Sequence, residues 1–429
     1  MKFYSTNNRA TLVSFKDAIF KGLPDDNGLF MPEHIPVLPT SFFDNLSNLT
    51  LPEIGLEVLK QFVGNEIPEI ALEELINDTF NFDIPLVQLS DSTYSLELFH
   101  GPTYAFKDVG ARFLARSLSH FIGKTDKKLT VLVATSGDTG SAVAQGFYDV
   151  PNIDVVILYP KNGISDFQEY QMTSLGKNIT ALEVDGAFDD CQALVKKAFL
   201  DKNLSMDKNL TSANSINIAR LLPQSIYYFY AFAQATFKPE TKYLVSVPSG
   251  NYGNLTAGLI AQRMGLPIHH FLACSNSNNT VPSYLQTSKY EPKPSVKTIS
   301  NAMDVGDPSN FARMLDLFDG SHQKMKEEIS GFSYSDIETR SAIKEVYNQS
   351  GYILDPHGAV GYLGLQERGL EINECGIFLE TAHSYKFKDT VEPEIGKSLT
   401  AVEEYSNEDN ESIPMQNDYT AFKDLLMSL

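Results

Sequence analysis

The chain has 429 residues, with 34 basic and 54 acidic side chains, so its formal net charge at neutral pH is −20. A hydrophobic content of 42% and a charged content of 21% indicate a folded globular protein of two or three domains rather than a disordered chain. The acidic surplus argues against a nucleic-acid partner and against an anionic membrane surface. An anionic small molecule is not excluded, because a cleft can be locally positive.

The three cysteines, Cys191, Cys274 and Cys375, lie far apart, and no CxxC pair is present, so neither a disulfide framework nor a zinc knuckle is supported. The first ten residues lack the apolar stretch of a signal peptide. No apolar run approaches the roughly 18 residues of a membrane-spanning helix. These features predict a cytoplasmic enzyme without a metal site.

Residues 1–85 are expected to form a small, mainly helical N-terminal domain. Periodic apolar residues predict helices over Glu53–Val63 and Ile70–Phe80, and prolines mark the turns between segments. From about Pro85 the pattern changes to short apolar strands that alternate with helices. This alternation indicates an α/β fold with a largely parallel sheet, and we expect the catalytic region to span residues 86–395.

The individual elements of the catalytic region follow from this pattern. The expected strands are Leu129–Ala134, Val155–Tyr159, Ile179–Val184, Tyr243–Val247 and Gly376–Glu380. The expected helices are Ala111–Ile122, Ser141–Tyr148, Asp166–Leu175, Asp189–Phe199, Leu255–Met264, Asn310–Phe318 and Asp336–Gln349. Between them, Gln286–Lys297 is typical of a connector. The tail, residues 396–429, is expected to hold an acidic solvated loop before a closing helix.

Three turns stand out because each follows a predicted strand, at the edge where open α/β sheets bind ligands. They are Thr135–Gly140 (TSGDTG), Ser249–Asn254 (SGNYGN) and Thr381–His383 (TAH). Gly250 and Gly253 are expected to take backbone conformations closed to other residues, so that successive N–H groups converge on one anion. Each turn alone is also explained as an ordinary strand-to-helix connection; three in one chain favour a phosphate-bearing ligand. The chain has no GxGxxG, Walker, GxSxG or HExxH motif.

Lys107 lies in the segment GPTYAFKDVG, where a helix is predicted to begin. Its neighbours Phe106 and Val109 would partly remove the ammonium group from water, which lowers the pKa of a lysine and exposes a nucleophilic amine. The alternative is a surface lysine at a helix start. The helix dipole disfavours a cation in the first turn, and this favours a functional role.

The segments GPTYAFKD, SGDTG, VPSGNYGN and TAH, in this order and at these spacings, resemble the threonine synthase family of fold type II pyridoxal-phosphate enzymes. The resemblance runs from Phe3–Asn7 (FYSTN) to about Lys388 and includes NAMDVGDPSNF, NSIN and DPHGAV. It implies two open, largely parallel sheet lobes beside the N-terminal domain. TAHSYKF replaces the commoner TAHPAKF, and Tyr252 stands where phenylalanine is frequent; both departures spare the groups with expected roles.

The resemblance implies a role for particular residues. Lys107 would carry pyridoxal phosphate covalently, Thr381 would pair with its pyridine nitrogen, and Asp138 would lie near the cofactor. The residues that would hold the cofactor's phosphate are Gly250, Asn251, Tyr252, Gly253 and Asn254. Those expected to bind the substrate carboxylate are Ser136, Gly137 and Thr139. Those expected to bind the substrate's own phosphate are Asn214, Ser215 and Arg220.

The implied reaction converts O-phospho-L-homoserine and water to L-threonine and phosphate by γ-elimination and β-addition of water, the last step of threonine biosynthesis. Threonine dehydratase and cysteine synthase share the fold and are the alternatives, but they do not need a second phosphate site such as the one expected at Arg220. A catalytically inactive ligand-binding relative is a further alternative, which the intact Lys107 disfavours. The chain is expected to be a monomer or a homodimer.

Overall fold

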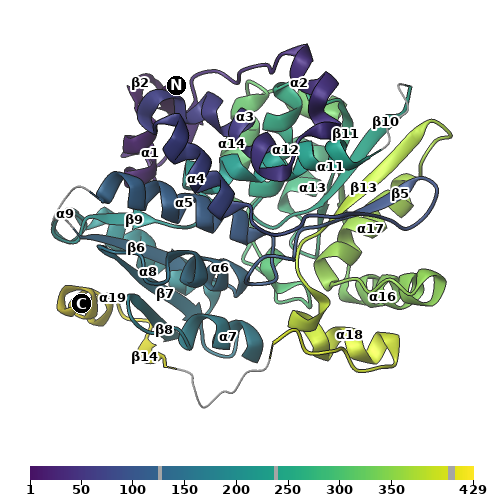
Figure 1. Ribbon diagram of the computed structural model, residues 1–429. Coiled ribbons are helices and arrows are strands. Elements are labelled where there is room, and N and C mark those ends of the chain that lie inside the picture. Colours follow the sequence, from purple (N-terminus) through teal and green to yellow (C-terminus); the bar gives the residue numbers. More distant parts are fainter. Residues whose placement is uncertain (124–127, 236–239, 404–410) are drawn as a thin grey trace.

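The computed structural model describes residues 1–123, 128–235, 240–403 and 411–429 (Figure 1). Most of the predicted acidic loop, residues 404–410, lies outside these ranges. Within them, no helix combines the length and the apolar character needed to cross a membrane.

The N-terminal region packs helices against a small antiparallel sheet. The two predicted helices are present as α3 (Leu51–Val63) and α4 (Glu69–Thr79). Helix α3 begins at a capping box, in which the Thr50 backbone N–H donates to Glu53 Oε2 at 2.7 Å. The sheet, of order β2-β1-β3, was not predicted: β1 and β3 have three residues each, and β2 is exposed along nearly its whole length, with no alternation of buried and exposed residues. The other elements here are β1 (Phe3–Ser5), β2 (Asn8–Val13), β3 (Phe30–Pro32), α1 (Phe15–Lys21), α2 (Thr40–Asn45), η1 (Leu46–Asn48) and η2 (Gly64–Glu66).

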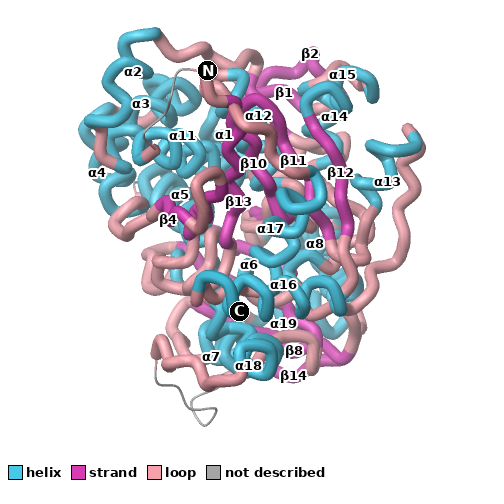
Figure 2. The backbone as a smooth tube through the Cα atoms, turned by 90° about the vertical axis from the view of Figure 1, so that its right-hand side faces the viewer, coloured by secondary structure: helices cyan, strands magenta, loops and turns pink. Residues whose placement is uncertain are grey.

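A six-stranded sheet of order β12-β11-β10-β13-β5-β4 forms one lobe. All its strand pairs are parallel except β4–β5 at one edge. Figure 2 shows β10, β11, β12 and β13 side by side, with α17 next to them. The strands are β4 (Leu86–Gln88), β5 (Thr93–Glu97), β10 (Lys242–Pro248), β11 (Ile268–Ser275), β12 (Ile329–Ser333) and β13 (Glu374–Glu380).

A five-stranded, fully parallel sheet of order β14-β8-β7-β6-β9 forms the second lobe. Leu132, Val156 and Leu182 on this sheet pack in one buried cluster with Leu194 and Phe422, so the C-terminal helix closes the lobe as expected. The edge strand β14 within the tail was not predicted. The strands are β6 (Leu129–Ala134), β7 (Ile153–Pro160), β8 (Ile179–Asp185), β9 (Leu210–Ser212) and β14 (Ile413–Gln416).

The largely parallel α/β architecture with two lobes is confirmed, and the predicted helices are present with ends that shift by a few residues. The helices of this region are α5 (Lys107–Ile122), α6 (Asp138–Phe147), α7 (Asp166–Thr173), α8 (Phe188–Leu200), α9 (Lys202–Asp207), α10 (Ile218–Leu221), η3 (Leu222–Gln224), α11 (Ser225–Gln234), α12 (Gly253–Arg263), α13 (Thr280–Thr287), η4 (Asn301–Met303), α14 (Phe311–Leu317), α15 (His322–Glu328), α16 (Asp336–Ser350), α17 (Pro356–Arg368), η5 (Ser384–Phe387), α18 (Lys388–Ile395) and α19 (Tyr419–Ser428).

The three glycine- and hydroxyl-rich turns follow β6, β10 and β13, at the carboxyl ends of parallel strands. Strands β10 and β13 are neighbours in one sheet, whereas β6 belongs to the other. The turns line one pocket, so the pocket lies between the two lobes.

Candidate functional site

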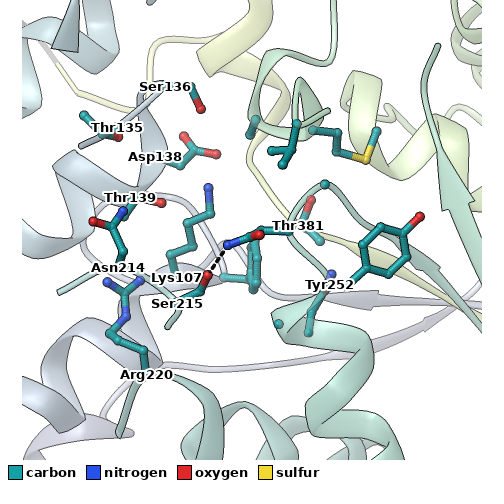
Figure 3. Close-up of a pocket in the computed structure, with 18 of the residues that line it drawn as sticks. Lys107, Thr135, Ser136, Asp138, Thr139, Asn214, Ser215, Arg220, Tyr252 and Thr381 are labelled. Carbon is teal, nitrogen blue, oxygen red and sulfur yellow. Dashed lines mark hydrogen bonds between the residues drawn. The ribbon is translucent and has the colours of Figure 1, made fainter. Parts of the chain in front are cut away.

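The pocket is a cavity of about 840 Å³, counted to its open mouth, which is within the usual range for a small-molecule site. Of the residues predicted from the sequence, all but Gly137 line it. Figure 3 shows that Lys107 and Asp138 point toward one another inside it. Among the described residues, no group of three or more His, Cys, Asp or Glu side chains is arranged to hold a metal ion.

Lys107 is the first residue of α5 and projects into the pocket, where it is partly exposed. The loop that precedes Lys107 is fixed by hydrogen bonds at two points. Asp108 accepts hydrogen bonds from Thr103 through the backbone N–H at 2.9 Å and the hydroxyl at 2.6 Å. The Phe106 N–H donates to the carbonyl of Thr381 at 2.9 Å, which ties the approach to Lys107 to the end of β13.

The electrostatic surroundings make Lys107 a weaker base than an ordinary lysine. Removal from bulk water by the pocket walls lowers its pKa to about 8, the charge of Asp138 opposes this effect, and the cations of Arg220 and Lys386 add to it. A large fraction of the amine is therefore neutral near pH 8 and able to act as a nucleophile or a base. The expected desolvation is present, although Phe106, with its ring centroid 5.7 Å from Nζ, is only one contributor.

The turn after β6 is held by Thr135, whose Oγ1 accepts hydrogen bonds from the N–H groups of Gly137 at 3.0 Å and Gly140 at 2.8 Å. Gly137 has φ +126°, and a Cβ there would lie 2.5 Å from the Gln168 side chain, so this position requires glycine. Gly137 therefore shapes the turn rather than the pocket wall. Ser136, Asp138 and Thr139 face the pocket.

Asp138 is buried at the start of α6, and its partner is a residue that the sequence analysis did not single out. Lys386 Nζ lies 2.8 Å from Asp138 Oδ1, and Gln168 Nε2 donates to the same oxygen at 2.9 Å. Burial alone would raise the pKa of this carboxyl, but the charges of Lys386 and Lys107 hold it well below its usual range. Lys386 lies in the TAHSYKF segment, five residues after Thr381. Its closeness in the chain to a predicted ligand turn could have identified it as a candidate site residue.

The turn after β10 corrects one expectation. Neither Gly250 nor Gly253 has a positive φ; the left-handed residue is Tyr252, with φ +59°. Gly250 is required for a different reason, because a Cβ there would lie 2.6 Å from Met303 Cα. The Tyr252 ring is buried, and its hydroxyl lies 2.5 Å from Ser275 Oγ, so tertiary packing stabilises the unusual backbone.

Asparagine side chains fix the rest of this turn. Asn254 Oδ1 accepts from Ser249 Oγ at 2.8 Å, and Asn254 Nδ2 donates to the Pro248 carbonyl at 2.8 Å. Gly250 to Asn254 line the pocket where α12 begins, and the first N–H groups of a helix have no acceptor within the helix. N–H groups at a helix N-terminus suit an anion.

Arg220 lines the pocket beside Asn214 and Ser215 (Figure 3). Its Nη1 donates to the Ala213 carbonyl, its buried Nε has no hydrogen-bond partner within the described residues, and burial lowers its pKa to about 10. Asn214 is held in place by β6, because its Nδ2 donates to the Ala134 carbonyl at 2.8 Å. A buried guanidinium that donates a hydrogen bond to a neutral carbonyl and, in the part of the chain that the structure describes, keeps Nε without a partner is suited to bind an anionic ligand.

Thr381 is buried at the end of β13 and faces the pocket. His357, also missed, lines the same wall: its Nδ1 lies 2.5 Å from Asp355 Oδ1, and its Nε2 accepts from the Ala302 N–H at 3.2 Å. Because Nε2 accepts, the proton of the neutral ring lies on Nδ1. This ring therefore anchors the η4 loop against the pocket.

Comparisons with known proteins agree with this architecture. The family model described as "Pyridoxal-phosphate dependent enzyme" matches residues 84–377, and that described as "Threonine synthase N terminus" matches residues 2–80. The chain is 43% identical to the threonine synthase of Escherichia coli (strain K12), over all of both chains. It is 38% identical to that of Saccharomyces cerevisiae, over 92% of this chain and 88% of the relative.

Solved structures of threonine synthases match the whole fold of this chain. The crystal structure of threonine synthase from Escherichia coli matches with a TM-score of 0.94 and 42% identity over all of both chains. The pyridoxal-phosphate-bound threonine synthase from Brucella melitensis matches with a TM-score of 0.92 and 32% identity, over 100% and 99% of the two chains. Maize serine racemase, at 14% identity and a TM-score of 0.54 over 73% of this chain and 92% of that one, shares the fold alone.

Proposed function

The chain belongs to the threonine synthase family of pyridoxal-phosphate-dependent lyases, and we propose that its pocket converts O-phospho-L-homoserine and water to L-threonine and phosphate. The observation that carries the proposal is that two regions suited to anions line one pocket around Lys107. The start of α12 forms one region, and Arg220 with Asn214 and Ser215 forms the other. A phosphorylated cofactor and a phosphorylated substrate together need two such regions.

The residues present fit pyridoxal phosphate. Lys107 offers an amine with a pKa of about 8 for its aldehyde, and Thr381 offers a hydroxyl for its ring nitrogen. The N–H groups between Gly250 and Asn254 offer donors for its phosphate. When bound, the cofactor supplies an electron sink for the pair released as a substrate C–H bond breaks. A hydroxyl partner at the ring nitrogen, unlike a carboxylate, favours elimination chemistry over transamination.

The protein's part in the reaction is to bind, orient and move protons. Arg220 would bind the substrate's phosphate, with donors from Asn214 and Ser215, and so place Cα near Lys107. Ser136 and Thr139 would bind the substrate carboxylate near the start of α6. Once the substrate's amine has freed it from the cofactor, the neutral Lys107 Nζ would take a proton from Cα, release it, and take a second proton from Cβ as phosphate leaves Cγ. Protons would then return to Cγ and Cα, water would add its hydroxyl at Cβ, and the remaining proton of water would go to the departing phosphate.

Substrate identity is testable directly. Purified protein loaded with pyridoxal phosphate is expected to release phosphate and form threonine from O-phospho-L-homoserine. It should turn over threonine or O-acetylserine at least about 100-fold more slowly, since neither substrate can engage Arg220 through a phosphate. Lys107→Ala should lose both turnover and the visible absorption of the bound cofactor, whereas Lys344→Met, an exposed lysine on α16, should keep both. A preference for threonine or O-acetylserine would contradict the proposal.

We further propose a cytoplasmic enzyme, monomeric or homodimeric, with an N-terminal domain over residues 1–85, a catalytic region over 86–395 and a tail over 396–429. The threonine synthase N-terminal match ends at residue 80 and the pyridoxal-phosphate enzyme match begins at residue 84, which supports the first boundary. Light scattering of the purified chain would distinguish the two oligomeric states.

A further inference from the structure

Lys386 is a fully buried lysine that the proposed reaction does not use. It lies in η5, directly after the turn that carries Thr381, and its side chain has no exposed surface. Its Nζ lies 2.8 Å from Asp138 Oδ1 and donates to the Thr103 carbonyl at 2.8 Å. One ammonium group therefore joins three loops: the loop before Lys107, the turn after β6 and the turn after β13.

Stability alone is a poor explanation for such a pair. Removing two charges from water has a large desolvation cost, and replacing a buried ion pair by apolar residues is often neutral or stabilising. The pair also joins the two lobes, since Asp138 follows a strand of the five-stranded sheet and Lys386 follows a strand of the six-stranded sheet. Its position beside the reactive lysine offers a functional reason.

The geometry leaves Asp138 able to serve a third partner through its other oxygen. Lys386 and Gln168 both reach Oδ1, and Oδ2 takes part in neither contact. Figure 3 shows the carboxylate facing the Lys107 amino group. A lone carboxylate at this position would hold the proton on Lys107 and make the amine a poor nucleophile. The Lys386 cation, paired with Asp138, offsets this effect of the carboxylate on Lys107 and leaves the carboxylate in place.

Resting on the proposed function, we propose that Lys386 is a positioning residue for the chemistry at Lys107: its ion pair fixes the Asp138 carboxylate beside the Lys107 amine and balances its charge. Asp138 thereby orients the amine without holding the proton on it.

The charges around the two groups set the sign of the expected effects. Lys107 is influenced by Asp138, Arg220 and Lys386, and Asp138 is also influenced by His357. Asp108, on the same helix as Lys107, faces both Lys386 and Arg220. Removal of the Asp138 charge should favour the neutral form of Lys107, because the carboxylate then no longer stabilises the ammonium. Removal of the Lys386 charge should favour the protonated form, because a second cation then no longer opposes the charge on Lys107. The Arg220 charge remains in both cases.

The test measures how fast the cofactor-free protein captures pyridoxal phosphate, by the rise of visible absorption, as a function of pH. The midpoint of the rate profile is expected to move down in Asp138→Asn and up in Lys386→Met, each by about half a pH unit or more. The double variant should lie between them. Lys344→Met should match the unmodified protein. Because no substrate is present, a wrong substrate assignment leaves these results unchanged.

A Lys386→Met midpoint that equals that of the unmodified protein, or that moves in the same direction as Asp138→Asn, would overturn the proposal. If Lys386→Met does not fold, the double variant, which leaves no lone buried charge, is compared with Asp138→Asn. Its midpoint should then be the higher of the two, and equal midpoints would overturn the proposal as well. If Lys386 had a purely structural role, Lys386→Met would lower the stability of the protein, and the midpoint of its rate profile would stay at that of the unmodified protein.

Discussion

Asn251 Nδ2 donates a hydrogen bond to Ser215 Oγ at 2.5 Å, so the turn proposed to hold the cofactor's phosphate contacts the loop proposed to hold the substrate's phosphate (Figure 3). Asn310 Nδ2 donates to the same oxygen at 3.2 Å. Both amides have fixed orientations, because Asn251 Oδ1 accepts from the Ser309 N–H at 2.6 Å and Asn310 Oδ1 accepts from Arg313 Nη1 at 2.7 Å. With two donors on its oxygen, the Ser215 hydroxyl is free to donate its own hydrogen into the pocket.

This contact predicts that Ser215 and Asn251 act together. Ser215→Ala should raise KM for O-phospho-L-homoserine about 10-fold, since one charge-assisted hydrogen bond is lost. Asn251→Ala should weaken cofactor binding and also raise KM. In the double variant the effects on KM should fall short of their product by at least about 2-fold, the coupling expected for side chains in contact. Ser341→Ala, on the exposed face of α16, is the control. Strictly multiplicative effects would show that the two loops act independently.

Replacement of Arg220 should weaken the use of the substrate and leave cofactor binding unchanged. Arg220→Gln removes the only guanidinium among the described residues that line the pocket, so kcat/KM for O-phospho-L-homoserine should fall about 100-fold or more. Visible absorption of the bound cofactor should persist. Inhibition by inorganic phosphate should weaken in parallel. If kcat/KM and phosphate inhibition are both unchanged, Arg220 does not bind the substrate's phosphate.

Gly250 and Gly253 offer a matched pair within one turn. A Cβ at Gly250 would lie 2.6 Å from Met303 Cα, whereas a Cβ at Gly253 would meet its nearest neighbours, Asn310 and Ser215, at 3.5 and 3.6 Å. Gly250→Ala should therefore lower the free energy of unfolding of the cofactor-free protein by about 1–3 kcal/mol, since backbone must move. Gly253→Ala should change it by less than about 1 kcal/mol. Denaturant titration measures both, and equal losses would contradict the packing argument.

The sequence predicted those parts of the site that depend on local pattern. Strand β6 was predicted with its observed ends, because Leu129–Ala134 is an apolar run interrupted only by Thr130 and followed by a glycine turn. Each ligand turn was predicted from the strand before it, because open α/β sheets bind ligands at the carboxyl ends of their strands. The meeting of the turn after β6 with the other two depends on the packing of the two lobes, since β6 belongs to a different sheet. Ser136 and Arg220 were then assigned to the site by resemblance to a family, and the structure brings them into one pocket.

The features that sequence reasoning missed depend on distant partners. Lys386 is far from Asp138 in the chain, and only the packing of the two lobes makes them an ion pair. Tyr252 adopts a left-handed backbone that local preference assigns to its glycine neighbours, since its ring and hydroxyl are held by Ser275 and the surrounding core. Strand β14 was missed because its four residues gain order by pairing with β8.

The pKa of Lys107, about 8, predicts how the cofactor-free protein reacts with pyridoxal phosphate. The neutral amine is the reacting form, and burial favours it, so the fraction available rises as pH passes through 8. Between pH 7 and 8 the capture rate should increase about 5-fold, and between pH 8 and 9 only about 2-fold. An ordinary lysine, with its pKa near 10.4, would give about a 10-fold rise in each interval. Stopped-flow absorbance distinguishes the two profiles, and a rate that keeps rising 10-fold per unit to pH 10 would show that the pocket leaves Lys107 as basic as a surface lysine.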